Sequence, residues 1–121
     1  MKLKKIDNIL AIYKIKDIKS LDLDQDFLFI AKTDEEISVV CDKDYKIDNF
    51  TEESKYWRAL RVDECLDFNL IGIIKNISTV LANNNIPIFA ISTFNTDYIL
   101  VKEENFNKTI NVLLKNNYEI I

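Results

Sequence analysis

Two short segments carry the residue types best suited to hold a small ligand. Gly72 is the only glycine in the chain, and it stands in the first turns of a predicted helix, where free N–H groups suit a carboxylate. Asp97 lies in a polar stretch between two strand-like runs, where its carboxylate could receive an ammonium group. A helix start and a carboxylate on one pocket would complement a zwitterion, provided that the fold brings the two segments together.

Each of these residues also has a structural explanation. At the position of Gly72, alanine would make a helix more stable by about 1 kcal/mol. Glycine there indicates either close packing of helix against sheet or a ligand that approaches the backbone. Asp97 follows Asn95 in sequence, and aspartate is common in turns and rare in strands, so it could simply be a hairpin residue. The sequence leaves these alternatives open.

The composition of the 121-residue chain excludes several classes of function. Histidine is absent, which removes the usual general base near neutral pH and the commonest nitrogen ligand of metals. Catalytic triads and zinc sites of the ordinary kind are therefore excluded. We expect no catalytic residues, no metal site and no cofactor. The 16 basic and 20 acidic residues give a formal net charge of -4, so the chain offers no basic surface for nucleic acid.

The cysteines and the hydropathy pattern indicate a cytoplasmic protein. Cys41 and Cys65 lie far apart and form no paired motif, which is typical of reduced, buried thiols. No segment is apolar for long enough to cross a membrane, so we expect no membrane partner.

The second half of the chain has a clear pattern of elements. Alternation in WRALRVD predicts a strand, and helical spacing from Leu70 to Leu81 predicts a helix with Asp67 as N-cap and an end at the asparagine run 83–85. IPIFAIS and DYILVK read as two strands of a hairpin joined by TFNT.

A second helical pattern follows in EENFNKTINVLLKNN, and residues 118–121 read as a last short strand. The order is β-α-β-β-α-β, which is that of a ferredoxin-like α+β sandwich.

The first half predicts strands without a full set of helices. NILAIYKI, DFLFIAKT and EISVVCD are strand candidates, with a turn at Asp34 and Glu35 between the last two. Residues 43–56 are polar and read as a connecting loop. We interpret this half as a truncated copy of the second.

The second half also resembles a known family. WRALRVD, the segment from LDFNLIGII through IFAISTF and TDYILVKEE, and the closing NNYEII are similar to the C-terminal ACT domain of small bacterial tandem ACT-domain proteins, relatives of amino-acid-sensing ACT proteins. The resemblance implies a degenerate N-terminal ACT-like lobe over residues 1–55 and a C-terminal ACT domain over residues 56–121.

The family implies regulatory binding of an amino acid without catalysis, at an interface between ACT lobes or subunits. Carried onto this sequence, backbone groups of the first strand-to-helix loop would hold the ligand carboxylate, and the hairpin would form the other wall with Asp97 on the ammonium. The residues implied for the site are Leu70, Ile71, Gly72, Ile73, Thr93, Phe94, Thr96 and Asp97.

We expect a homodimer that passes its signal to an unidentified regulated protein. The alternative is a protein-interaction module that dimerises without ligand and keeps only a vestigial pocket. In IPIFAIS both faces are apolar, which predicts that the N-terminal strands or a second copy of the chain cover the second face.

Overall fold

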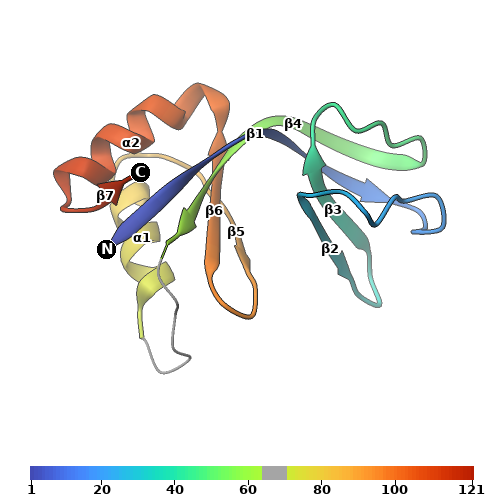
Figure 1. The fold of residues 1–121 in the computed structure, drawn as a ribbon, viewed down its shortest axis with the longest axis horizontal. Coiled ribbons are helices and arrows are strands. Elements are labelled where there is room, and N and C mark those ends of the chain that lie inside the picture. The colour runs from blue at the N-terminus through green and yellow to red at the C-terminus, as the bar shows by residue number, and fades with distance from the viewer. Residues whose placement is uncertain (64–70) are drawn as a thin grey trace. The chain divides into compact units, whose positions relative to one another are not determined.

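The fold was taken from a computed structural model, which describes residues 1–63 and 71–121. The chain forms two compact units (Figure 1). Residues 1–7 and 58–121 make up the C-terminal unit, and residues 8–57 make up the N-terminal unit. Two long strands, β1 (Lys2–Ile15) and β4 (Phe50–Val62), contribute residues to both.

The C-terminal unit has the element order that the sequence predicts. From the end of β4 the elements are α1 (Ile73–Ala82), β5 (Phe89–Ser92), β6 (Asp97–Lys102), the short 3-10 helix η1 (Glu103–Asn105), α2 (Phe106–Lys115) and β7 (Glu119–Ile120). The predicted β-α-β-β-α-β pattern is confirmed. The prediction of Asp67 as N-cap of the first helix is wrong, because α1 begins at Ile73 with Gly72 in the N-cap position. Asp67 itself lies outside the described residues.

The start of β1 completes the sheet of this unit. The hydrogen-bonded order here is β7-β1-β4-β6-β5, with Lys2 and Leu3 paired in parallel to Glu119 and Ile120. The N–H of Asp63 donates to the Lys2 carbonyl over 2.9 Å at the end of β4. The sequence predicts a first strand from residue 8, and this boundary is wrong. The strand begins at Lys2 because Lys2 and Leu3 pair with β7 and the Leu3 side chain is buried in the core of this unit.

Both helices pack on one face of this sheet (Figure 1). Side chains from α1 and α2 interlock with alternate residues of β1, β4 and β6, which is how an amphipathic helix covers a sheet. The buried core consists of Leu3, Leu60, Val62, Ile77, Leu81, Ile86, Ile99, Val101, Phe106 and Leu113.

The turns of the C-terminal unit also follow the sequence. The N–H of Thr93 donates to the Thr96 carbonyl over 2.8 Å, which closes the hairpin between β5 and β6. The asparagine run ends α1, and Asn85 has a φ of 58°, a conformation that asparagine tolerates better than most residues. The hairpin and the helix end are thus set by local residue types.

The N-terminal unit is built from strands. β2 (Leu28–Lys32) and β3 (Ile37–Asp42) form the predicted hairpin, with the Thr33 N–H donating to the Glu36 carbonyl over 2.9 Å. β3 pairs antiparallel with β1. The predicted loop over 43–56 is wrong in its second part, because β4 already begins at Phe50. The polar residues at the start of β4 are mostly exposed, and their composition is typical of a loop. They nevertheless form a strand, because β4 pairs with β1.

Within the described residues, no helix has the length and hydropathy that a membrane span requires.

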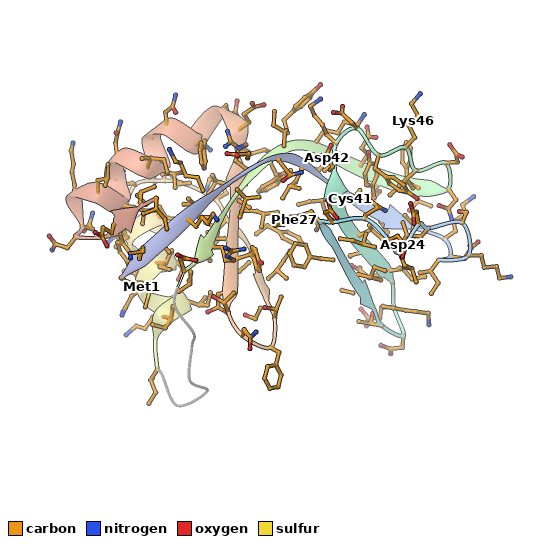
Figure 2. All side chains as sticks on the ribbon, in the orientation of Figure 1. Met1, Asp24, Phe27, Cys41, Asp42 and Lys46 are labelled. Carbon is orange, nitrogen blue, oxygen red and sulfur yellow. The ribbon has the colours of Figure 1, made fainter. Side chains whose placement is uncertain are left out.

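Cys41 is a buried free thiol on β3, next to Asp42 (Figure 2). Burial, helped by the Asp42 carboxylate, raises the pKa of the Cys41 thiol to about 11. In a Cys65→Ser variant, where Cys41 is the sole thiol, we expect native protein to react with a thiol reagent at least 100-fold more slowly than urea-unfolded protein, since about two pKa units change the thiolate fraction roughly 100-fold. Equal rates in the two states would contradict the burial of Cys41.

Candidate functional site

The predicted site residues gather at one end of the C-terminal unit. Figure 1 shows the end of β4, the start of α1 and the hairpin between β5 and β6 at the same end. A hydrogen bond ties two of these parts together, since the Thr96 hydroxyl donates to the Val62 carbonyl over 2.7 Å. Leu70, the first of the predicted residues, lies outside the described part of the chain.

Gly72 is the N-cap residue of α1 and adopts a left-handed conformation, with φ 82° and ψ 14°. A Cβ built at this position would meet only the Asn76 Nδ2 at 4.0 Å among the described atoms, which is ordinary contact. Close packing against the sheet therefore does not explain the glycine. The positive φ does, because it costs a residue with a side chain about 1 kcal/mol or more.

Among the described residues, no side chain forms a hydrogen bond that caps this end of α1. The first N–H groups of a helix have no partner within the helix, and the helix dipole favours negative charge beside them. The start of α1 can therefore accept an anionic group such as a carboxylate.

Two large apolar side chains flank this end of the unit. Ile71 precedes Gly72 and is 92% exposed, and Phe94 at the hairpin turn is 80% exposed. Ile73, the first residue of α1, instead packs against the core.

Asp97 begins β6 directly opposite Ser92 on β5. Its Oδ1 accepts a hydrogen bond of 2.6 Å from the Ser92 hydroxyl. Because side chains alternate along a strand, Asp97 shares the helix-covered face with Ile99, whereas Thr96 lies on the opposite face. The two hairpin residues therefore present their side chains to different sides of the sheet.

A polar hollow of about 420 Å³ lies beside Thr96, on the face opposite the helices. Its described lining residues are Arg61, Val62, Asp63, Thr93, Asn95, Thr96 and Tyr98. Four of these residues were not predicted to line a site, namely Arg61, Asp63, Asn95 and Tyr98. The i, i+2 spacing of an arginine and an aspartate on one strand is the signal that could have found this face.

A second hollow, of about 220 Å³, is neutral in character. It is lined by Met1, Ile73, Asn76, Asn116, Asn117 and Tyr118. Of the predicted site residues, Ile73 therefore lines this smaller hollow, whereas Thr93 and Thr96 line the polar hollow. Within the described residues, no group of three or more histidine, cysteine or acidic side chains is arranged to hold a metal ion.

Comparison with known families gives one match, to the family model described as an ACT domain, over residues 52–115. This span covers β4 from Glu52 onward, α1, the hairpin and α2, and so contains every predicted site residue.

Solved structures with the same fold cover nearly the whole chain. A crystal structure of a protein from Agobacterium tumefaciens matches with a TM-score of 0.88 at 26% identity, over 99% of this chain and 91% of that one. The aspartate kinase of Clostridium acetobutylicum, an allosteric enzyme, matches with a TM-score of 0.63 at 15% identity, over 91% of this chain and 32% of the enzyme.

A third structure comes from Porphyromonas gingivalis W83, and a role as the C-terminal regulatory domain of aspartate kinase has been suggested for it. It matches with a TM-score of 0.56 at 16% identity, over 92% of this chain and 91% of that one. At this level of identity, the two kinase-related matches show a shared fold alone.

Proposed function

Because the chain belongs to the ACT-domain family, we propose that it is a regulatory protein that binds a small ligand, an amino acid, and catalyses no reaction. The similarity to structures described as regulatory parts of aspartate kinase supports a regulatory role.

The observation that carries this proposal is the start of α1, which no described side chain caps and which lies at the same end of the C-terminal unit as the β5–β6 hairpin (Figure 1). Gly72 leaves the helix N–H groups open to a ligand carboxylate, and Asp97 supplies a negative charge for an ammonium group. The helix N–H groups and the Asp97 carboxylate thus complement the two charged groups of an amino-acid zwitterion.

We place the ligand between two walls at this end of the unit. Leu70, Ile71, Gly72 and Ile73 are proposed for the backbone wall, and Phe94 and Asp97 for the hairpin wall. Thr93 and Thr96, which the family resemblance also implies for this wall, line the hollow on the opposite face of the sheet. The exposure of Ile71 and Phe94 supports completion of the site by a facing lobe or subunit, since large exposed apolar side chains often mark interaction surfaces.

The test is calorimetry of the protein against each standard amino acid. We expect one or more to bind saturably, and Asp97→Asn to weaken that binding by about tenfold or more, the effect of losing a hydrogen bond to a charged group. Asparagine keeps the oxygen that accepts from Ser92, so the change removes the charge with little effect on the hairpin.

The matched control is Asp34→Asn, at an exposed turn of the N-terminal unit, which should leave binding unchanged. The proposal fails if no amino acid binds to the folded protein. The position of Asp97 in the site fails if both aspartate variants bind like the wild type.

We further propose that the protein is cytoplasmic, forms a homodimer and signals through a regulated partner protein. β5 is the last strand in the sheet order, and an edge strand of this kind favours side-by-side pairing of sheets from two copies.

Sedimentation with and without amino acids distinguishes a ligand-binding regulator from the alternative function, a protein-interaction module. Such a module would remain a tight dimer and respond to no amino acid.

A further inference from the structure

We propose that the polar hollow on the helix-free face is a second binding site, for a small zwitterion whose acid group lies on Arg61 and whose amine lies between Asp63 and Thr96. This site shares the hairpin with the site at Gly72 and Asp97 but faces the other side of the sheet. It does not depend on that first site.

The charges of the hollow come from one strand. Arg61 and Asp63 are two residues apart on and just after β4, so their side chains emerge on the same face about 7 Å apart along the chain. Both line the hollow, and their side chains are 29% and 35% exposed. A cation and an anion therefore lie within reach of one bound molecule.

The ion pair between them leaves binding capacity unused. Arg61 Nη2 and Asp63 Oδ1 are 3.5 Å apart, whereas a strong charge-assisted hydrogen bond spans about 2.7–2.9 Å. A guanidinium offers five donors in a fork that matches a carboxylate, and a carboxylate can accept several bonds. A ligand that carries both charges can thus form shorter hydrogen bonds with Arg61 and with Asp63 than these two residues form with each other.

The hydroxyl groups of the hollow favour an amine at one end. Thr93 Oγ1 donates to the Thr96 carbonyl over 3.1 Å, and Thr96 Oγ1 donates to the Val62 carbonyl over 2.7 Å. With its proton engaged on the Val62 carbonyl, the Thr96 oxygen can act as an acceptor, whereas Thr93 Oγ1 already accepts from the Thr96 N–H over 3.4 Å. The Thr96 oxygen adds to the negative charge of Asp63 and suits an ammonium group, while Arg61 is the donor for the acid.

The volume sets the size of the ligand. About 420 Å³ falls within the range of roughly 300–1,000 Å³ that is typical of small-molecule sites. Asn95 carries both donors and an acceptor and can bind a polar side chain of the ligand.

The sequence itself provides a clean reporter for this site. Arg58 and Arg61 are the only arginines, so the side-chain Nε–H groups give two NMR signals, and Gly72 gives a single glycine amide signal. Titration of the ¹⁵N-labelled protein with each standard amino acid should shift the Arg61 signal saturably and leave the Arg58 signal unchanged. Acetate and methylamine, each with one charge, should bind at least tenfold more weakly than the amino acid that shifts Arg61 most.

Variants at the two charges complete the test. Arg61→Gln and Asp63→Asn should each weaken binding at this site by about tenfold or more, while Asp97→Asn should not change it. If a variant were to unfold, the Arg61 signal of the wild-type protein would still decide the question.

The two proposed sites fail separately. A saturable shift of the Gly72 signal with no shift at Arg61 would overturn the second site and keep the first. A shift at Arg61 alone would keep the second site and overturn the placement of the first. An unchanged Arg61 signal with every amino acid overturns the second site in any case.

Discussion

Replacing Leu113 with alanine is expected to lower the free energy of unfolding by about 3 to 4 kcal/mol, within the range for buried leucine truncations. Leu113 lies on α2, is fully buried and belongs to the core that joins both helices to β1, β4 and β6. Truncation removes apolar contacts and leaves a cavity that the surrounding side chains cannot fill completely.

The next residue of the same helix is the matched control. Leu114 is 51% exposed, so Leu114→Ala should cost less than about 1 kcal/mol. Urea unfolding followed by far-ultraviolet circular dichroism measures both variants, since both α-helices belong to the C-terminal unit. Similar losses for the two leucines would contradict the position of the core.

Replacing Arg58 with alanine is expected to destabilise the protein by about 2 kcal/mol, whereas Arg61→Ala should cost less than about 1 kcal/mol. The guanidinium carbon of Arg58 lies 4.1 Å from the centroid of the Phe106 ring, and its Nη2 donates to the Ile6 carbonyl over 3.2 Å. This side chain therefore joins β4, β1 and α2. Arg61 lies on the same strand, and its ion pair with Asp63 is long, at 3.5 Å.

The environment of Arg58 sharpens this comparison. Its Nε is buried and has no hydrogen-bond partner among residues 1–63 and 71–121, so part of its stabilising effect is offset by lost hydration. A double-mutant cycle of Arg58→Ala with Phe106→Leu, followed by urea unfolding, isolates the contact between the cation and the ring. A coupling energy of zero, or equal losses for the two arginine variants, would contradict the stabilising role of this contact.

Much of the C-terminal unit could be predicted from local patterns. Helical spacing around Ile77 and Leu81, the asparagines after α1 and the polar turn from Thr93 to Thr96 each report a structure that short-range contacts largely determine. Arg58 and Arg61 lie three residues apart, and an odd spacing of this kind places two side chains on opposite faces of one strand. The structure bears this out, because Arg58 stacks on α2 and Arg61 lines the helix-free hollow.

The candidate site was predictable only in part. Gly72 could be selected from the sequence because it is a lone glycine at a predicted helix start. Its positive φ, which explains the glycine, could not be predicted from the neighbouring residues. The hollow beside Thr96 was not foreseen, because it combines β4 with a hairpin about thirty residues later in the chain. Whether either site binds a ligand stays a prediction.

The sequence by itself determined the type and order of the elements in the second half of the chain, because helix and strand periods and turn residues act over a few positions. Only the tertiary structure decided that residues 1–7 join that half between β7 and β4, and that polar residues from Phe50 onward form a strand. It also decided that Thr96 and Asp97 serve opposite faces of the sheet. These features depend on hydrogen bonds and packing between segments far apart in sequence, whose pairing no local pattern specifies.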